Sequence, residues 1–503
     1  MDTSFTGGLH SRFLRGLALS EGGTAVRVGD QELSYGRLHE QALRWGGALA
    51  EAGARTVGVL AGKGLSAYAG LLAGLYAGAT VVPLRPDFPA ARTAQMVEAA
   101  GVDAVVVDAR GEALLPEVLG ERRVLVLSPE TEVGESRALV APREVRPEDS
   151  AYVLFTSGST GRPKGVRIGH GSTEHYFGLL DARYDFTPED VFSQTFDLNF
   201  DCAMFDLFCA WGAGAPAVVL PGRAYRDLPA FAAESGLTVW FSTPSAIDLV
   251  RRTGGLTPGA LPHLRWSFFA GEALTVRDTA DWRAAAVNAT TENLYGPTEL
   301  TITVAGYRWD DEETPRVAVN GVVPIGAVHE GHEHLLLGEG DVEEPEEGEL
   351  AIAGPQLTPG YLDPADERGR FLERGGRRFY RTGDRVRRLA GGDLAYLGRL
   401  DSQVQVLGWR VELTEVEHAL RATGVQDAVA LGVSGVSGTE LFVFYTGGER
   451  PVIELVRPLR EVLPEGVIPR HYRHVDEFPL NSNRKIDRKA LAAEAAVLLT
   501  PVG

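Results

Sequence analysis

The sequence predicts an α/β protein in which a large N-terminal domain precedes a small, mobile α+β C-terminal domain. Three observations predict this class. Before about Glu312, short apolar runs alternate with helical patterns, which is typical of parallel-type sheets covered by helices. From there to Tyr396, short strands with glycine turns indicate a β-rich subdomain. The remaining residues alternate strand and helix again. We therefore expect domains at 1–397 and 398–503.

The expected elements of the N-terminal domain follow this alternation in order. Buried strands are expected at 24–28, 57–61, 80–84, 104–108, 151–155, 217–220, 238–241 and 266–269, and helices at 35–53, 65–78 and 244–252. Ligands in such folds collect at the carboxyl ends of the strands. The acidic, turn-rich stretch at 338–349 is expected to be a solvated loop.

Composition excludes several classes of protein. The chain has 503 residues, 44% of them hydrophobic and 23% charged, which is an ordinary globular balance. No apolar run reaches the ~18 residues that a membrane-spanning helix needs, and 1–20 does not resemble a secretory signal. The net charge of −19 argues against nucleic acid as a partner. The two cysteines, Cys202 and Cys209, are too far apart along one helix for a disulfide. We expect a reduced, cytoplasmic protein without a structural metal.

A loop rich in hydroxyls and glycines follows the expected strand at 151–155. Residues 156–165 read TSGSTGRPKG, with four hydroxyls, three glycines and one lysine. Glycines let backbone N–H groups approach an anion, hydroxyls add donors, and Lys164 supplies positive charge. The loop is not a Walker A motif, because GxxxxGK[ST] is absent. It predicts a phosphate site, although a flexible surface turn is an alternative for the loop alone.

Five later segments accompany this loop in a fixed order. They are AGE at 270–272, NLYGPTE at 293–299, YRTGD at 380–384, YLGRLD at 396–401 and PLNSNRKIDRK at 479–489. Together with the loop, they resemble the adenylate-forming superfamily, which includes acyl-CoA synthetases, luciferases and peptide-synthetase adenylation domains. The resemblance extends from about Leu33 to Ala490. It implies that ATP and Mg²⁺ are used.

The resemblance also implies a role for each matching residue. The phosphates of ATP would lie against Thr156, Ser157, Gly158, Ser159, Thr160 and Lys164. The adenosine would contact Ala270, Gly271, Glu272, Asn293, Leu294, Tyr295, Gly296, Asp384 and Arg399, with Asp384 accepting hydrogen bonds from the ribose hydroxyls. Thr298 would lie near the α-phosphate, and Glu299 would be a hard oxygen ligand for Mg²⁺.

The same resemblance places a hinge at Asp401 and the catalytic lysine at Lys485. A movable cation suits a reaction in which negative charge builds up on the α-phosphate. Three positions depart from the family pattern. Arg484 stands where the family usually has glycine, and Gln405 and Leu407 stand where it commonly has a lysine and an arginine. These changes bear on how the acceptor is held more than on adenylation.

Residues 200–208, FDCAMFDLF, resemble the substrate segment of amino-acid-activating members, including D-alanine ligases. The match places Asp201 where a carboxylate pairs with the substrate's α-ammonium group. Asp197 offers a second register, ranked lower because Asp206 then misaligns, and helix capping or a surface role is the alternative for Asp201. The implied pocket residues are Asp201, Cys202, Phe205, Phe241, Phe268, Ala270, Leu294, Ile302 and Thr303. Three phenylalanines and a leucine leave little volume, which favours alanine, glycine or serine.

The expected function is ATP-dependent activation of a small amino acid, followed by transfer to the phosphopantetheine thiol of a carrier protein. No carrier domain follows within the 503 residues and no condensation domain precedes, so we expect a stand-alone enzyme and a separate carrier. Carriers of this type are acidic, and the basic tail would suit one; it comprises Arg470, Arg473, Arg484, Arg488 and Lys489. Three alternatives stay open: a ligase that uses coenzyme A, a β-amino-acid-activating relative, and a non-catalytic nucleotide-binding protein.

Overall fold

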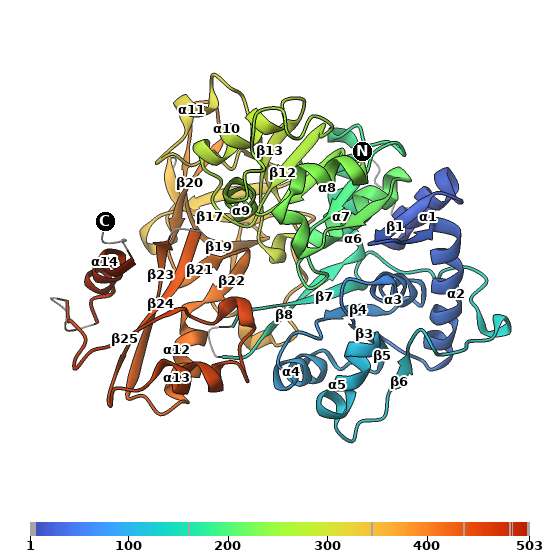
Figure 1. Ribbon diagram of the computed structural model, residues 1–503, viewed down its shortest axis with the longest axis horizontal. Coiled ribbons are helices and arrows are strands. Elements are labelled where there is room, and N and C mark those ends of the chain that lie inside the picture. Colours follow the sequence, from blue (N-terminus) through green and yellow to red (C-terminus); the bar gives the residue numbers. More distant parts are fainter. Residues whose placement is uncertain are drawn as a thin grey trace. The chain divides into compact units, whose positions relative to one another are not determined.

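The computed structural model describes residues 7–158, 161–343, 346–435, 438–481, 484 and 486–499 (Figure 1). These residues form two compact units. The first comprises the described residues of 1–86, 97–155 and 165–400, and the second those of 87–96, 156–164 and 401–503. The domains predicted at 1–397 and 398–503 stay a prediction.

The first unit contains a six-stranded sheet in the order β6-β5-β3-β4-β7-β8. Its strands are β3 (Thr56–Leu60), β4 (Thr80–Leu84), β5 (Ala104–Val107), β6 (Leu125–Leu127), β7 (Ser150–Thr156) and β8 (Lys164–Gly169). The pairs β6–β5, β5–β3, β3–β4 and β4–β7 are parallel, as the continuous apolar runs predicted.

The helices of this part of the chain are α2 (Tyr35–Glu51), α3 (Leu65–Tyr76), α4 (Ala90–Ala100) and α5 (Ala109–Leu119). Helix α3 packs on β3, β4 and β5, and it is buried from Ala67 to Tyr76 because it is apolar all round. Its glycines allow this close approach, since a Cβ at Gly70 would lie 2.8 Å from Val106. Figure 1 shows α2 beside α3.

The second sheet of this unit has nine strands in the order β15-β14-β13-β12-β11-β9-β10-β1-β2. They are β1 (Thr24–Val28), β2 (Gln31–Ser34), β9 (Phe192–Gln194), β10 (Ala217–Val219), β11 (Val239–Ser242), β12 (Trp266–Phe269), β13 (Thr290–Tyr295), β14 (Ala305–Arg308) and β15 (Ala327–Val328). The inner strands are parallel, whereas β2, β14 and β15 are antiparallel at the edges. The carboxyl ends of β11, β12 and β13 therefore lie side by side.

The helices of this part of the chain are α1 (His10–Ser20), α6 (His170–Arg183), α7 (Cys202–Ala213), α8 (Leu228–Ser235), α9 (Ser245–Arg252), α10 (Val276–Ala285) and α11 (Thr314–Val317). Helix α7 is buried along its whole length and contains both cysteines, which are free. The absence of a disulfide agrees with the prediction. Among the described residues, no helix combines the length and apolar character that crossing a bilayer requires.

A third, antiparallel sheet confirms the predicted β-rich subdomain. It contains β16 (Glu333–Leu337), β17 (Glu347–Ala353), β18 (Phe371–Arg374), β19 (Arg377–Arg388) and β20 (Leu394–Arg399). The prediction of a solvated loop at 338–349 is wrong at its C-terminal end, because β17 begins at Glu347. Arg385 and Arg387 of β19 pair with Glu347, and this pairing lets a charged stretch enter a sheet.

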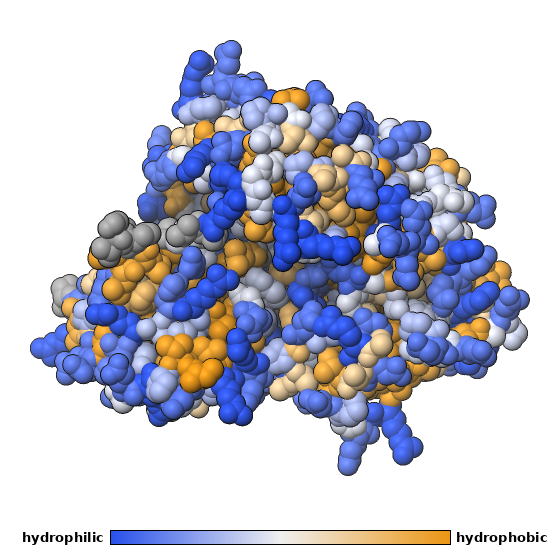
Figure 2. Space-filling model, viewed as in Figure 1, coloured by the Kyte–Doolittle hydropathy of each residue, from blue (hydrophilic) through white to orange (hydrophobic). Residues whose placement is uncertain are grey.

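The second unit is α+β, as predicted. It contains the hairpin β21 (Gln403–Val406) and β22 (Trp409–Glu412), the sheet of β23 (Asp427–Gly435), β24 (Gly438–Thr446) and β25 (His471–His474), and the helices α12 (Leu413–Arg421), α13 (Val452–Leu459) and α14 (Arg488–Leu499). Its main core forms where α12 and α13 pack on the sheet, around Val416, Leu420, Val443 and Leu455. On the face viewed in Figure 2, hydrophilic side chains predominate and apolar ones form small groups, one of them at α13, where Ile453 is 64% exposed.

Two buried histidines, His10 at the start of α1 and His170 at the start of α6, predict loss of stability in acid. The rings of His10 and His170 lie 6.4 Å apart, and His10 also contacts Tyr76 edge-on at 5.9 Å. Nδ1 of His170 accepts the N–H of Leu9 at 3.0 Å, which requires a neutral ring. Burial lowers the pKa of both histidines to about 4. Both are therefore neutral in the folded protein at neutral pH.

The unfolded chain binds these protons with an ordinary pKa of about 6.5. The two neutral histidines therefore make their full contribution to the free energy of unfolding above that pH. This contribution is lost as the pH drops from about 6.5 towards 4, and the loss is roughly 2 kcal/mol per histidine at pH 5. Nδ1 of His10 is buried and makes no hydrogen bond to a described residue, so His10→Phe should fit and should halve this loss. Urea denaturation at pH 7.5 and 5 measures it. Equal losses in variant and wild type would contradict the assignment.

Candidate functional site

Tyr295, Asp384 and Arg399, all assigned to the adenosine, form a cluster in the first unit. Asp384 lies opposite Arg399 on the neighbouring strands β19 and β20. Oδ1 of Asp384 accepts Nη1 of Arg399 at 2.7 Å, and Oδ2 accepts the hydroxyl of Tyr295 at 2.5 Å. Burial and then the charge of Asp384 raise the pKa of Tyr295 well above its usual value, so its hydroxyl stays a donor. This carboxylate is held rigidly with both oxygens oriented by protein donors.

Three of the residues assigned to the adenosine also support the protein itself. Nδ2 of Asn293 donates to the carbonyl of Pro324 at 2.9 Å, and Oε2 of Glu272 accepts the N–H of Ser245 at 2.9 Å, at the first turn of α9. A Cβ at Gly296 would lie 2.6 Å from Cα of Thr303, so only glycine fits there. These contacts fix the backbone along which Ala270, Gly271 and Leu294 lie. Their contact with a nucleotide stays a prediction.

Asp201 lies at the start of α7 with its side chain directed to a residue of the NLYGPTE segment. Its Oδ2 accepts the hydroxyl of Thr298 at 2.7 Å, and it makes no side-chain capping hydrogen bond to α7. Burial raises the pKa of Asp201, and the bond from Thr298 partly offsets that shift. The capping role and the ammonium-binding role of Asp201 both stay predictions. Burial disfavours the ionised form of this carboxylate. A cationic ligand bound beside it would stabilise the ionised form, so the carboxylate is suited to such a ligand.

The competing carboxylate, Asp197, has a different environment. It pairs with Nη1 of Arg85 at 2.5 Å, so its charge is already matched. Asp206, one turn into α7, is 1% exposed and accepts the N–H of Thr195 at 3.0 Å. Its Oδ1 makes no hydrogen bond to a described residue, and burial raises its pKa well above the usual value. The assignment of the ammonium group to Asp201 stays a prediction from the family match.

Aromatic rings form a wall beside Asp201. Phe205 of α7 contacts Phe241 of β11 and Phe268 of β12, with ring centroids 4.8 and 5.2 Å apart. The structure thus brings together three side chains that were predicted to line one pocket. Ile302 and Thr303 lie in the turn before β14, and the hydroxyl of Thr303 lies 2.9 Å from that of Tyr176. Cys202 is buried at 8% exposure next to Asp201.

Glu299 is the predicted metal ligand, and its surroundings fit one hard cation bound mainly by other groups. It is 1% exposed, and Oε1 accepts the hydroxyl of Tyr361 at 2.7 Å. Within the described ranges, no group of three or more His, Cys, Asp or Glu side chains could hold a metal ion. Mg²⁺ is commonly bound by one or two carboxylates together with phosphates and water. Glu299 could supply one such carboxylate, and its contact with Mg²⁺ stays a prediction.

The phosphate loop belongs to the second unit. The hydroxyl of Ser157 accepts the N–H of Glu412 at 2.9 Å and donates to the carboxylate of Glu415, which also pairs with Arg92 at 2.7 Å. Gly158 is required by close approach, since its Cβ would lie 1.9 Å from the carbonyl of Arg162. Thr156 ends β7 and Lys164 begins β8. Ser159 and Thr160 lie outside the described residues.

Asp401, the predicted hinge, and two of the departures from the family pattern, Leu407 and Arg484, lie elsewhere in this unit. Oδ1 of Asp401 accepts the N–H of Gln403 at 3.2 Å, which stiffens the start of β21. Leu407, at the β21–β22 turn, has φ of 50°, and Arg484 has φ of 59°. Both are in the left-handed region that glycine adopts most easily, which explains why glycine suits position 484 in the family. Lys485, the predicted catalytic lysine, lies outside the described residues.

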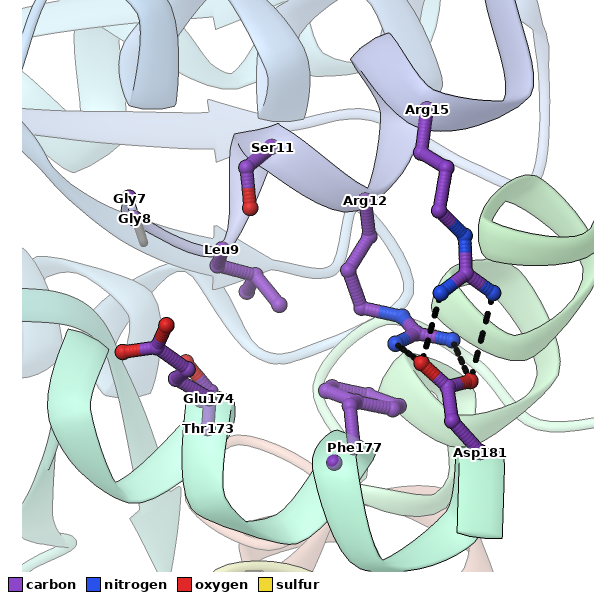
Figure 3. Close-up of a pocket in the computed structure, with 11 residues that line it drawn as sticks. Gly7, Gly8, Leu9, Ser11, Arg12, Arg15, Thr173, Glu174, Phe177 and Asp181 are labelled. Carbon is purple, nitrogen blue, oxygen red and sulfur yellow. Dashed lines mark hydrogen bonds and ion pairs between the residues drawn. The ribbon is translucent and has the colours of Figure 1, made fainter. Parts of the chain in front are cut away.

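A separate cavity of about 360 Å³ lies between α1 and α6 (Figure 3). Arg12 and Arg15 both point to Asp181 from one side, and the Arg12 guanidinium lies 4.7 Å from the Phe177 ring centroid. Nε of Arg12 also donates to the carbonyl of Phe208, and Nε of Arg15 to that of Gly212. The arginine donors are thus used to clamp α1 to α6 and α7. None of the predicted site residues lines this cavity.

Residues 17–362 match the family described as AMP-binding enzyme. The chain belongs to the AMP-binding enzyme family. This AMP-binding enzyme is 31% identical to an L-proline--[L-prolyl-carrier protein] ligase of Pseudomonas fluorescens, over 97% of its own length and 99% of the relative's. The recognised resemblance and the predicted fold class are thereby confirmed.

Two solved structures resemble the AMP-binding enzyme over nearly the whole chain. One is IdnL7, with 59% identity, a TM-score of 0.77 and coverage of 98% of this chain and 99% of that one. The other is the Vibrio cholerae adenylation domain AlmE in complex with glycyl-adenosine-5'-phosphate, with 27% identity, a TM-score of 0.87 and 99% coverage of both chains.

Sequence reasoning missed four residues that shape the site: Tyr361, Gln356, Tyr176 and Glu415. Each contacts a predicted site residue or the turn that contains one. Tyr361 and Gln356 lie in GPQLTPGY at 354–361, directly after β17. Nothing in this turn-rich segment indicated that the glutamine is buried among hydrogen-bond partners.

Proposed function

We propose that this AMP-binding enzyme activates a small amino acid as its aminoacyl adenylate and then transfers it to the thiol of a separate carrier protein. One observation carries the proposal. The carboxylate of Asp201 is hydrogen-bonded to Thr298, the residue assigned to the α-phosphate, and Glu299 follows in the chain. An ammonium group at Asp201 would bring the carboxylate of the same amino acid close to the reacting phosphorus. The names of the prolyl-carrier ligase and of the glycyl-adenylate complex support this reading.

The reaction would proceed in two steps. A carboxylate oxygen of the amino acid attacks the α-phosphorus of ATP, the bond between the α-phosphorus and the bridging oxygen breaks, and pyrophosphate leaves. The carrier's thiolate then attacks the acyl carbon, a thioester forms, and AMP leaves. Lys164 and Lys485 would balance phosphate charge in the first step, and Asp384 and Arg399 would hold the ribose throughout. Phe205, Phe241 and Phe268 would limit the side chain to about the size of alanine, glycine or serine.

ATP–pyrophosphate exchange across D-, L- and β-amino acids tests the first step. We expect exchange with small amino acids and little with acidic, basic or large aromatic ones. Fastest exchange with a fatty acid or with phenylalanine would overturn the assignment, and fastest exchange with a β-amino acid would favour that relative. Comparing thioester yield with coenzyme A and with phosphopantetheinylated carriers decides the acceptor.

The structure narrows the basic surface proposed for the carrier. Arg488 donates to the carbonyl of Ala430 and pairs with Glu417 at 2.5 Å, and Arg473 pairs with Glu494 at 2.9 Å. Both guanidinium groups are thus already paired with carboxylates of the second unit. Arg470, Arg484 and Lys489 are exposed, and we propose them as the main contacts with a carrier.

Reversing charge at Arg470 and Lys489 is expected to slow loading of an acidic carrier about tenfold at low salt and less at high salt, because steering of this kind is screened. Amino-acid-dependent pyrophosphate exchange should stay unchanged. Arg223→Glu, at another exposed arginine in the first unit, is the matched control. Unchanged loading at every salt concentration would remove this surface from the proposal.

A further inference from the structure

The turn between β13 and β14 connects the two halves of the proposed site. It begins with Thr298 and Glu299 and ends with Ile302 and Thr303, so it contains both the predicted phosphate and metal residues and part of the amino-acid pocket. Thr301 and Ile302 have φ of 57° and 70°. Two consecutive β-branched residues in this region cost roughly 1–3 kcal/mol each, so the surroundings must hold the turn in place.

One buried side chain provides much of that support. Gln356 is fully buried, and its Nε2 donates to three carbonyls of the turn: Leu300 at 3.0 Å, Thr301 at 3.2 Å and Thr303 at 2.8 Å. In return, the hydroxyl of Thr301 donates to the carbonyl of Gln356 at 2.7 Å. A single amide thus bonds to the turn on both sides of Ile302.

The orientation of that amide is fixed by a histidine. Nδ1 of His329 lies 3.4 Å from Oε1 of Gln356, which directs Nε2 towards the turn. The N–H of His329 donates to the carbonyl of Val304 at 2.8 Å, so the same residue also holds the end of the turn. Burial lowers the pKa of His329 to about 4, so its ring is neutral at neutral pH.

Glu299, the predicted metal ligand in this turn, is held by other groups. The N–H of Thr358 donates to the carbonyl of Glu299 at 2.8 Å, and Tyr361 donates to its carboxylate. Neither contact uses the Gln356 side chain. Loss of that amide should therefore disturb the part of the turn at 300–303 while Glu299 keeps its supports.

We infer that Gln356 is a positioning residue that sets the shape of the amino-acid pocket by holding the strained turn at 300–303. The inference rests on the proposed function, and it adds a residue that touches neither ATP nor the amino acid. The residue acts by keeping Ile302 and Thr303 at a fixed depth in the pocket.

Gln356→Met tests the inference, because methionine has a similar length and no donor. We expect the KM for the preferred small amino acid to rise about tenfold or more and the KM for ATP to change less than about threefold. The preference for that amino acid over valine and leucine should narrow. Wild-type selectivity in a stable Gln356→Met protein would overturn the inference.

Asp190→Asn is the control for a merely structural loss. Asp190 is 2% exposed and accepts Arg265 at 2.6 Å and Thr238 at 2.7 Å, near the amino ends of β11 and β12. This variant should lower the melting temperature without changing amino-acid preference. If Gln356→Met does not fold, Thr301→Val tests the inference instead, because it removes one hydrogen bond to Gln356. Its amino-acid preference should shift in the same direction. An unchanged amino-acid preference would count against the inference. A wild type that exchanges with no amino acid would instead refute the proposed function.

Discussion

Replacing Asp201 with asparagine is expected to lower kcat/KM for the amino acid by about 100- to 1000-fold, with the KM for ATP changed only a few-fold. Removing one partner of a buried charge pair costs ~3–5 kcal/mol, and the substrate's ammonium would face a neutral amide. Asparagine has the same shape and keeps an acceptor for the hydroxyl of Thr298 at 2.7 Å. The phosphate side of the site should therefore be preserved. Steady-state pyrophosphate exchange at varied amino-acid concentration measures the effect.

Asp197→Asn is the matched control for this prediction. Asp197 is paired with Arg85, so its loss should alter exchange little beyond a stability change. If Asp197→Asn abolished amino-acid dependence while Asp201→Asn did not, the ammonium site would lie in the second register.

The wild type should also lose kcat/KM for the amino acid as the pH falls, because burial raises the pKa of Asp201 and protonation removes its charge.

Replacing Lys485 with alanine is expected to slow adenylate formation by about 100- to 1000-fold, the loss typical of one charge-stabilising donor. The expectation follows from the family motif at 479–489, since Lys485 lies outside the described residues. Transfer of the aminoacyl group from chemically supplied adenylate to the carrier should change much less, because in that step the nucleophile attacks the acyl carbon and not the α-phosphorus. Single-turnover measurements of each half-reaction separate the two effects.

Lys489→Ala provides a comparison within the same motif. Lys489 is exposed at the start of α14, and its removal should leave adenylate formation within about twofold of the wild type. Equal slowing by both substitutions would mean that the charge of the tail, rather than one swinging lysine, assists the reaction. Wild-type adenylation by Lys485→Ala would remove Lys485 from the mechanism.

Local patterns predicted the strands and helices well because burial on both faces leaves a continuous apolar run. The run at 57–61 became β3 (Thr56–Leu60), and the helix expected at 65–78 became α3 (Leu65–Tyr76). The loop expected at 338–349 was partly wrong, because charged residues usually indicate solvent. Here cross-strand arginines pair with Glu347, and that compensation depends on β19, which is distant in the sequence.

The sequence by itself determined the α/β class, the family and the set of candidate site residues, because short motifs carry their own chemistry in glycines, hydroxyls and charges. Only the tertiary structure decided which partner each candidate has: Asp201 with Thr298, Asp197 with Arg85, and Arg488 with Glu417. It also identified Gln356, which no motif indicated. The physical reason is that hydrogen bonds and ion pairs join residues far apart in the chain, and their strength depends on burial, which exists only after folding.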